Sequence, residues 1–409
     1  MKSIVIAIGV LTPMATLVGQ NPIEAPASGL HVVSTETFAE NLNYAVPLSI
    51  SVAGAQLKDG IDGGQATTIQ WRSNGETDPG AVGLSVLYRV SYENNAVNSR
   101  LGGFSHDLRL SGNRKLTPRL ALSFTGAASS STFLSFATES PLSNSDALAS
   151  PLRLALGGFR QREGEAGMTL SYEVSPRAMW AVRSDFMRQL PATSINPVSG
   201  GAGYPGASLV GVGSMYVYKL SPRSSVSTEL DYAGTYSAIV PNSISTASMR
   251  YTREVSTFLS AYVGGGYSLL STQYNGVSHT NGAPLAEVGA QWKRGSWSLQ
   301  GGGLRSAGDS YGLGASSRLS AQLTLGWSRP TSPWILSAGG AYEHLRGAAF
   351  PLIRDWLLTS SVGRKLSRQT ELRAEFIWTS EVGSIFTIYP EWNRRGARIS
   401  FIWFPNSSI

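Results

Sequence analysis

Cysteine is absent from the 409 residues of the chain, and histidine is scarce. The lack of cysteine excludes disulfide bonds, thiolate metal ligands, cysteine nucleophiles and a lipid anchor on an N-terminal cysteine. The sequence also has no H-E-x-x-H zinc motif, no P-loop and no G-x-S-x-G motif in a strand–turn–helix setting. We therefore expect no catalytic residue, no cofactor-binding residue and no metal ligand, and we predict that the chain is not an enzyme. The four histidines are His31, His106, His279 and His344.

Two of the histidines have a carboxylate beside them in the sequence. Because neighbouring residues of a β-strand point to opposite faces, His106 and Asp107 cannot act as a catalytic pair if they lie in a strand. Glu343 and His344 near a loop leave a barrel enzyme as an alternative, but no motif supports it.

Charged residues are few, at 14% of the chain, and the formal net charge of +7 is spread along the sequence. No cluster of lysine and arginine of the kind that binds nucleic acid occurs, so we expect no nucleic-acid partner. Long hydrophobic runs are lacking too. Beyond the N-terminus, no stretch reaches the ~18 apolar residues that identify a membrane helix.

The N-terminal segment has the features of a secretory signal peptide. Lys2 precedes an apolar stretch that ends near Val18 and is followed by small residues. We predict that residues 1–20 are this signal peptide; the alternative is a buried N-terminal strand or helix. Residues 21–45 are then a short periplasmic lead-in, and residues 406–409 are a C-terminal tail.

Residues that favour strands and turns are abundant, since the chain has 45 glycines and 10% of its residues are aromatic. Glycine, β-branched and aromatic residues are poor helix formers, and the β-branched and aromatic ones favour strands. Apolar and polar residues also alternate through most of the chain, as in "SSVSTELDY". There Val226, Thr228, Leu230 and Tyr232 share one face, and Ser225, Ser227, Glu229 and Asp231 share the other. Each such segment is predicted to be a β-strand with one apolar and one polar side.

Eighteen segments of this kind follow one another, with two kinds of connection between them. Short turns of related sequence, such as "LTPR", "VSPR", "LSPR" and "LSRQ", alternate with longer loops rich in Ser, Asn, Gly and Pro. We therefore expect the short turns at one end of the fold and the long loops at the other. The first two segments are the weakest, so sixteen strands is the alternative count. The predicted strands are residues 46–56, 65–74, 81–95, 104–115, 118–130, 165–175, 177–188, 207–220, 223–235, 243–253, 256–270, 283–293, 296–307, 315–328, 334–345, 353–365, 370–381 and 395–404.

Strand length separates two possible architectures. Amphipathic strands suit a soluble β-sandwich as well as a membrane barrel, because period two shows only that the two faces differ. The predicted strands are mostly ten to fifteen residues long, whereas soluble strands average ~5–6 residues and a tilted membrane strand needs ~9–11. We therefore predict an all-β fold, a closed antiparallel transmembrane β-barrel over residues 46–405 with about 18 strands.

Charged residues on the polar faces are candidates for the lining of the barrel lumen. Closing 16 or 18 strands leaves room for an aqueous channel. The candidates carry both signs, as in a general diffusion pore, and the basic excess of the chain would mildly favour anions. They are Asp107, Arg109, Lys115, Glu173, Arg183, Asp185, Glu229, Asp231, Glu371, Arg373 and Glu375.

Aromatic residues near the strand ends are candidates for the interfacial girdles of a membrane barrel. An amphipathic ring is most stable between the hydrocarbon and the headgroups, although ordinary β-propensity accounts for the same residues. These aromatics are Tyr88, Tyr92, Tyr216, Tyr218, Trp356, Trp378, Trp392 and Trp403.

The signal peptide, the recurrent L-S-P-R turns, the amphipathic strands and the last strand, "ARISFIWFP", together resemble Gram-negative outer-membrane β-barrels of the large, porin-like kind. The resemblance implies a place in the outer membrane, contact with outer-membrane lipid, and the barrel-insertion machinery as a partner. That machinery reads a final strand that alternates apolar residues and ends on an aromatic, and Ala397, Ile399, Phe401 and Trp403 supply this alternation. The sequence departs from the family in the "PNSSI" that follows.

The resemblance also implies a function, a passive channel for small hydrophilic solutes. The alternative is a non-conducting barrel that acts through its long loops as a structural, adhesive or export-partner protein. In the family the third extracellular loop often narrows the pore. With eighteen strands that loop is residues 131–164, and with sixteen it is the second loop. Solute identity and oligomeric state leave no pattern in the sequence.

Overall fold

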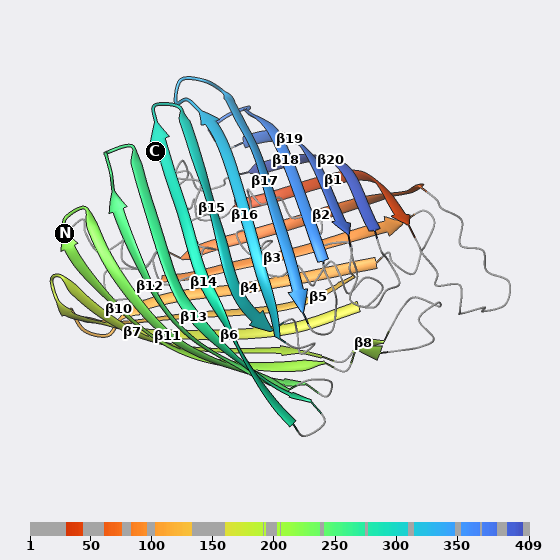
Figure 1. Ribbon diagram of the computed structural model, residues 1–409. Coiled ribbons are helices and arrows are strands. Elements are labelled where there is room, and N and C mark those ends of the chain that lie inside the picture. The colour runs from red at the N-terminus through yellow and green to blue at the C-terminus, as the bar shows by residue number, and fades with distance from the viewer. Residues whose placement is uncertain are drawn as a thin grey trace.

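The chain forms antiparallel β-strands in the computed structural model (Figure 1). None of the described residues belongs to a helix long and apolar enough to span a membrane. The structure describes residues 30–43, 61–75, 83–95, 103–132, 160–190, 192–193, 203–204, 206–237, 241–274, 277–309, 315–347, 353–368, 370–382 and 391–403.

Eighteen strands form one large sheet, and two short strands, β8 and β9, form a separate hairpin. All pairings are antiparallel, so the predicted all-β antiparallel fold is confirmed. The strands are β1 (Leu30–Asn43), β2 (Ile61–Gly75), β3 (Gly83–Asn95), β4 (Gly103–Lys115), β5 (Leu120–Thr132), β6 (Arg160–Ser175), β7 (Ala178–Gln189), β8 (Ala192–Thr193), β9 (Gly203–Tyr204), β10 (Ala207–Ser221), β11 (Ser224–Ser237), β12 (Asn242–Glu254), β13 (Leu259–Tyr274), β14 (Val277–Arg294), β15 (Trp297–Asp309), β16 (Ala315–Ser328), β17 (Trp334–Gly347), β18 (Ile353–Lys365), β19 (Thr370–Val382) and β20 (Glu391–Trp403).

The order of strands in the large sheet follows the sequence. Each strand pairs with the one before it and the one after it, with β10 following β7 across the small hairpin. The last strand, β20, pairs with β1 along its whole length, from Trp403 opposite His31 to Glu391 opposite Asn43. Every strand of the sheet therefore has two neighbours. In Figure 1 the short turns, such as those between β10 and β11 and between β14 and β15, gather at one end of the strands.

The repeated short turns are shaped by a hydroxyl group. In the turn between β10 and β11, the backbone N–H of Arg223 donates a hydrogen bond of 3.2 Å to Oγ of Ser221, and Pro222 between them restricts φ. The same bond, at 3.3 Å, forms from Arg177 to Ser175 between β6 and β7. The S-P-R triplet is therefore a hydroxyl-capped turn whose arginine leads into the next strand.

The sheet begins earlier in the chain than predicted. Strand β1 lies inside the segment 21–45, so the predicted boundary between lead-in and barrel is wrong. This strand was not predicted because both of its faces mix polar and apolar residues, as in "HVVSTETF". Its place is set by its pairing with β2 and β20. The predicted strand 46–56, the signal peptide and the tail lie outside the described residues.

One predicted loop, residues 271–282, is mostly strand. β13 continues to Tyr274 and β14 begins at Val277. The polar residues that suggested a loop take part in the pairing, and the hydroxyl groups of Ser271 and Ser278 share a hydrogen bond of 3.0 Å. The polar composition therefore shows where the apolar residues of this hairpin end. The backbone hydrogen bonds between its two strands continue beyond that point.

Candidate functional site

The register divides the strand residues of the large sheet between two faces. Paired positions can be followed from strand to strand through all eighteen, and they return to the face from which they started. We call the face that contains Asp231 the inner face and the face that contains Leu230 the outer face. Large apolar side chains are exposed on the outer face, among them Leu110, Met168, Leu170, Val212, Leu230, Met249, Val263, Val288, Leu323, Leu336, Leu358, Phe376 and Ile399.

All eleven charged residues predicted from the sequence lie on the inner face. Asp231, for example, is paired with Gly213, and Gly213 is paired in turn with Arg183. Glu371 and Asp107 are buried among their neighbours, whereas Lys115 is exposed beside a short turn. The alternation in the sequence was thus sufficient to assign the face of each residue.

The sign of the charge differs between the two faces. Among the residues whose side chains the structure describes, every Asp, Glu and Lys of the large sheet lies on the inner face. The outer-face cations are arginines near the strand ends. Among inner-face residues with described side chains, carboxylates outnumber cations, so these residues give no support to the expected preference for anions, which stays a prediction. The carboxylates are Asp107, Glu163, Glu165, Glu173, Asp185, Glu229, Asp231, Glu254, Glu287, Glu343, Asp355, Glu371 and Glu375, and the cations are Arg109, Lys115, Arg183, Lys219, Arg250, Lys293, Arg318, Lys365, Arg373 and Arg398.

Arg183 on β7 is surrounded by three carboxylates. Its Nη2 lies 2.7 Å from Oδ1 of Asp231 and 3.0 Å from Oε1 of Glu229, both on β11. Its Nε lies 3.9 Å from Oδ2 of Asp185 on its own strand. One positive charge therefore holds together three negative ones, and the cluster keeps a net negative charge.

A second arginine, Arg250 on β12, makes a two-pronged ion pair with Glu287 on β14. Nε donates to Oε1 at 2.6 Å and Nη2 donates to Oε2 at 2.5 Å, which is the strong fork geometry of arginine with a carboxylate. The guanidinium carbon also lies 5.2 Å from the ring centroid of Tyr262. Both charged groups are largely buried, and each satisfies the other.

Four further arginines of the inner face are paired with carboxylates. Arg373 Nη2 lies 2.7 Å from Glu371 Oε1, Arg109 Nε lies 3.3 Å from Asp107 Oδ2, Arg398 Nη1 lies 3.6 Å from Glu375 Oε2, and Arg318 pairs with Glu343. Arg250, Glu287, Arg318, Glu343 and Arg398 were not among the residues predicted to line the lumen. For Arg250, Glu287 and Arg398 the alternation of the sequence contained the signal, since each lies between two apolar neighbours, as in "LAEVGA".

Glycines on the intervening strands allow two of these ion pairs to form. Gly213 lies between Arg183 and Asp231, and a Cβ there would be 2.8 Å from the arginine Nε. Gly264 lies between Arg250 and Glu287, and a Cβ there would be 2.8 Å from the glutamate Cγ. Each arginine therefore crosses a strand that has no side chain at that position. The charges lie along the wall of the sheet and do not project from it.

A second group of inner-face charges lies at the end with the short turns. All of its members except Lys115 donate the backbone N–H to a carbonyl oxygen in the short turn of the preceding hairpin, as Glu173 does to Arg119 and Lys219 to Arg177, both at 2.8 Å. These bonds fix the strand ends beside the turns. The group, which we call the mouth ring, consists of Lys115, Glu173, Lys219, Glu254, Lys293 and Lys365.

The histidine–carboxylate neighbours do not form catalytic pairs. His106 lies on the outer face, where its Nδ1 is 2.9 Å from the hydroxyl of Tyr88, while Asp107 lies on the inner face. His344 and Glu343 are divided in the same way. Within the part of the chain that the structure describes, no group of three or more His, Asp or Glu side chains is placed to hold a metal ion.

The aromatic residues predicted to form girdles lie on the outer face wherever their side chains are described. Tyr88, Tyr92, Tyr216 and Trp356 are among the exposed side chains there. The side chains of Trp392 and Trp403 lie outside the described part of the structure. Loop 131–164, predicted to narrow the pore, lies outside the described residues apart from its ends.

Comparisons with known proteins give structural neighbours only. No protein-family model and no curated protein matches the chain. Among solved structures, the chain is similar to OccAB4 of Acinetobacter baumannii, at 9% identity over 94% of this chain and 99% of that one, with a TM-score of 0.41. It is also similar to OccK2 (OpdF) of Pseudomonas aeruginosa, at 12% identity over 92% and 97%, with a TM-score of 0.44.

A third neighbour, OpdK of Pseudomonas aeruginosa, was solved with vanillate and matches at 10% identity over 91% of this chain and 98% of that one, with a TM-score of 0.43. These neighbours are similar to the chain in fold alone. At this level of similarity the neighbours do not indicate a substrate or a solute selectivity for this chain.

Proposed function

We propose that the chain forms a closed, eighteen-stranded β-barrel in the outer membrane and acts as a passive channel for small hydrophilic solutes. The pairing of β20 with β1 supports closure, because it leaves the large sheet without a free edge. The number of strands is even, and the start of β1 and the end of β20 both lie at the end of the sheet with the short turns. Both features are typical of bacterial outer-membrane barrels.

The spacing of outer-face residues along β18 supports a membrane span. Arg354 and Arg364 bracket the outward side chains Trp356, Leu358 and Val362. Ten residue steps of ~3.3 Å make ~33 Å of strand. With the usual strand tilt of ~35–45°, this corresponds to a band about 23–27 Å tall, close to the ~25 Å of outer-membrane barrels.

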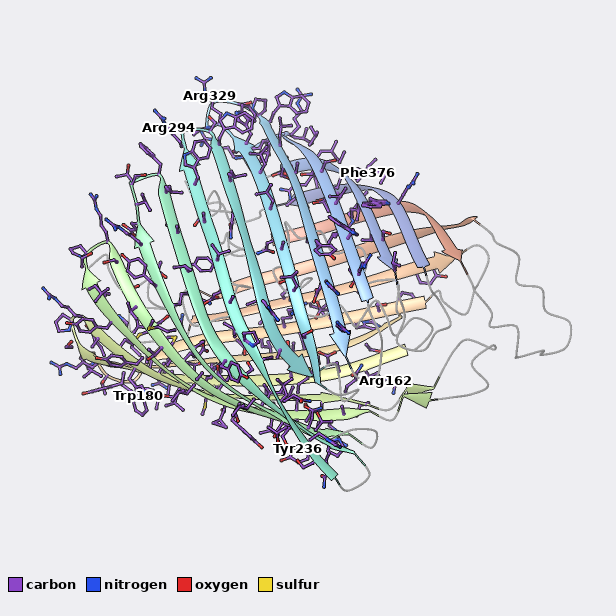
Figure 2. All side chains as sticks on the ribbon, viewed as in Figure 1. Arg162, Trp180, Tyr236, Arg294, Arg329 and Phe376 are labelled. Carbon is purple, nitrogen blue, oxygen red and sulfur yellow. The ribbon has the colours of Figure 1, made fainter. Side chains whose placement is uncertain are left out.

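The separation of apolar and charged side chains between the two faces carries the proposal. A soluble sandwich buries its apolar face and hydrates its charged one. Trp180 and Tyr236, two exposed residues of the apolar face, project from the outside of the curved sheet in Figure 2, and the ion-paired charges lie on the opposite face, which supports an interior lined by charge. An interior so rich in charge requires water, and a ring of eighteen strands is wide enough to hold a column of it.

Conductance tests the proposed channel directly. We expect purified, folded protein in a planar lipid bilayer to give discrete current steps, and the same protein heated to unfold the barrel to give none. Folded protein that inserts into the bilayer and stays silent would contradict the channel and favour a non-conducting barrel that acts through its loops.

The orientation of the barrel gives a second expected result. We expect Ser278→Cys, near the loop end, to react with an impermeant thiol reagent on intact cells, because long loops of such barrels face the outside. Ser221→Cys, in a short turn, should react only after the outer membrane is permeabilised. The native chain has no cysteine, so each signal belongs to the new residue. The reverse pattern of labelling would mean that the short turns face outward.

A further inference from the structure

Three strands share one arrangement of inner-face charge along their length. Each has a carboxylate in the part towards the long loops and a lysine at or next to the last residue before a short turn. The pairs are Asp107 and Lys115 on β4, Glu287 and Lys293 on β14, and Asp355 and Lys365 on β18. The two members of a pair are six to ten residues apart. At ~3.3 Å per residue and a strand tilt of ~35–45°, they are separated by ~14–27 Å along the barrel axis.

The short-turn end of the inner face is basic. The mouth ring contains four lysines and two glutamates, and the described residues of the short turns add five arginines and no carboxylate. All nine of these cations are exposed, and none of them forms an ion pair among the described residues. Their charge therefore acts on the ions in the water at this end of the barrel. The five turn arginines are Arg119, Arg177, Arg223, Arg329 and Arg368.

The rest of the inner face is acidic. Its described charged side chains are eleven carboxylates and six arginines, and each of these arginines is ion-paired with a carboxylate of the same group. The charge along the inner face therefore changes sign near the short turns. We call the eleven carboxylates the acidic wall: Asp107, Glu163, Glu165, Asp185, Glu229, Asp231, Glu287, Glu343, Asp355, Glu371 and Glu375.

Inner-face positions for which only the backbone is described follow the same division. The register places five acidic residues and three arginines at these positions. The one nearest to a short turn is an arginine, Arg72, three residues before the end of β2. The eight residues are Glu36, Glu40, Asp62, Arg72, Arg89, Glu93, Glu381 and Arg394.

A lumen with opposite charges at its two ends conducts differently in the two directions. Fixed charges on the wall of a pore attract mobile ions of the opposite sign. A positive potential at the loop end drives cations inwards past the acidic wall and anions inwards past the mouth ring, so both kinds of ion accumulate in the lumen and raise its conductance. The opposite potential draws both kinds out through the ends that attract them, and the lumen is depleted of ions.

We propose that the channel rectifies: it carries more current when its loop end is positive than when that end is negative by the same voltage. The acidic wall and the four lysines of the mouth ring set this direction. Cations enter preferentially from the loop end and anions from the short-turn end. The proposal rests on the channel proposed above and names the charge selectivity of each of its ends.

The width of the lumen sets the salt concentration at which rectification is expected. Eighteen strands that lie ~4.8 Å apart and are tilted by ~35–45° close into a ring with a backbone radius of roughly 17–19 Å. Charges act over a Debye length of ~10 Å at 0.1 M salt and ~3 Å at 1 M. Because charged clefts produce potentials of several kT, we expect the currents at about +100 and −100 mV to differ about twofold or more in 0.1 M KCl. In 1 M KCl the ratio should approach one.

The test measures this current ratio in single channels of the native protein and of matched variants. The lysine variant combines Lys115→Gln, Lys219→Gln, Lys293→Gln and Lys365→Gln. It should lose about half of the rectification or more, because it removes four of the nine cations at that end. Arginine at the same four positions keeps the charge and should keep the native ratio.

A control variant removes the same charge from the outer face at the same end. Its four arginines are each adjacent in sequence to a member of the mouth ring, and Figure 2 shows one of them, Arg294. Since they face away from the lumen, the control should keep the native ratio. The control variant combines Arg114→Gln, Arg253→Gln, Arg294→Gln and Arg364→Gln.

A further variant tests the acidic wall independently of the lysines. Asp185→Lys reverses the charge of a side chain that is 54% exposed, so it should fold and should lower the ratio. The orientation of each channel is established with Ser221→Cys, which is labelled with biotin before reconstitution. Streptavidin added to one chamber then lowers the current only of channels whose short turns face that chamber.

Several outcomes would overturn the proposal. They are equal currents in the native channel in 0.1 M KCl, a larger current when the loop end is negative, and a ratio that persists unchanged in 1 M KCl. A lysine variant or an Asp185→Lys variant with the native ratio, or an equal loss in the control, would assign the asymmetry to other groups. Gel mobility of unboiled samples shows that each variant is folded. Folded native protein that inserts and carries no current refutes the proposed channel, whereas a symmetric current in a conducting channel refutes the rectification alone.

Discussion

Leu230→Arg is expected to prevent most of the protein from folding into lipid bilayers. Leu230 lies on the outer face at the middle of β11 and is 64% exposed. In a membrane barrel this places it against lipid hydrocarbon, where an arginine at mid-depth costs ~2–4 kcal/mol. Folding is read from the different gel mobilities of boiled and unboiled samples.

The neighbouring change, Asp231→Arg, is expected to fold normally and to shift the ion selectivity of the channel towards anions. Asp231 lies on the inner face, where its Oδ1 accepts a hydrogen bond of 2.7 Å from Nη2 of Arg183. Replacing it reverses a charge in a cluster that is otherwise net negative. Reversal potentials under a salt gradient measure the shift, with Asp231→Asn as a control that should give a smaller change in the same direction.

The pair of variants separates the membrane barrel from a soluble sandwich. A sandwich with Leu230 in its core would also reject arginine there, so Leu230→Arg alone decides little. If Asp231→Arg changes neither selectivity nor conductance in a channel that conducts, Asp231 does not line the pore, and the proposed role of the inner face is wrong.

Gly264→Leu is expected to destabilise the barrel and to lower its conductance. The new side chain would occupy the space of the Glu287 carboxylate, which accepts both hydrogen bonds of the ion pair with Arg250. Losing a charged hydrogen bond costs about 1.5–3 kcal/mol, and the displaced guanidinium would move into the interior. Stability is measured as the shift in the guanidinium chloride midpoint, and conductance in planar bilayers.

The next residue provides the control for this prediction. Gly265 lies on the outer face, where an added Cβ would have only the Leu285 carbonyl oxygen within contact distance, at 3.6 Å. Gly265→Leu adds the same side chain to the same strand, facing lipid, and is expected to be neutral or slightly stabilising. Equal destabilisation by both variants would mean that β13 rejects leucine for a reason unrelated to the ion pair.

The sequence by itself determined which way each side chain of most strands faces. Alternation with period two is a local property, and a slip of one residue would move every side chain to the wrong face. Asp107, Arg183 and Glu371 were therefore assigned to the inner face without any knowledge of their neighbours. The S-P-R turns were equally local, since their hydroxyl cap joins residues two apart in the sequence.

Only the tertiary structure decided how those charges combine. Arg183 binds Asp231, 48 residues away, because three strands align in one register and the middle one has a glycine at the crossing point. The mouth ring likewise exists only because antiparallel pairing brings the ends of six strands to the same end of the sheet. Strand β1 belongs to the sheet because β2 and β20 offer it a hydrogen-bond ladder on both sides. Pairing between strands distant in sequence depends on the register of both partners, and a pattern along one chain segment contains only half of that information.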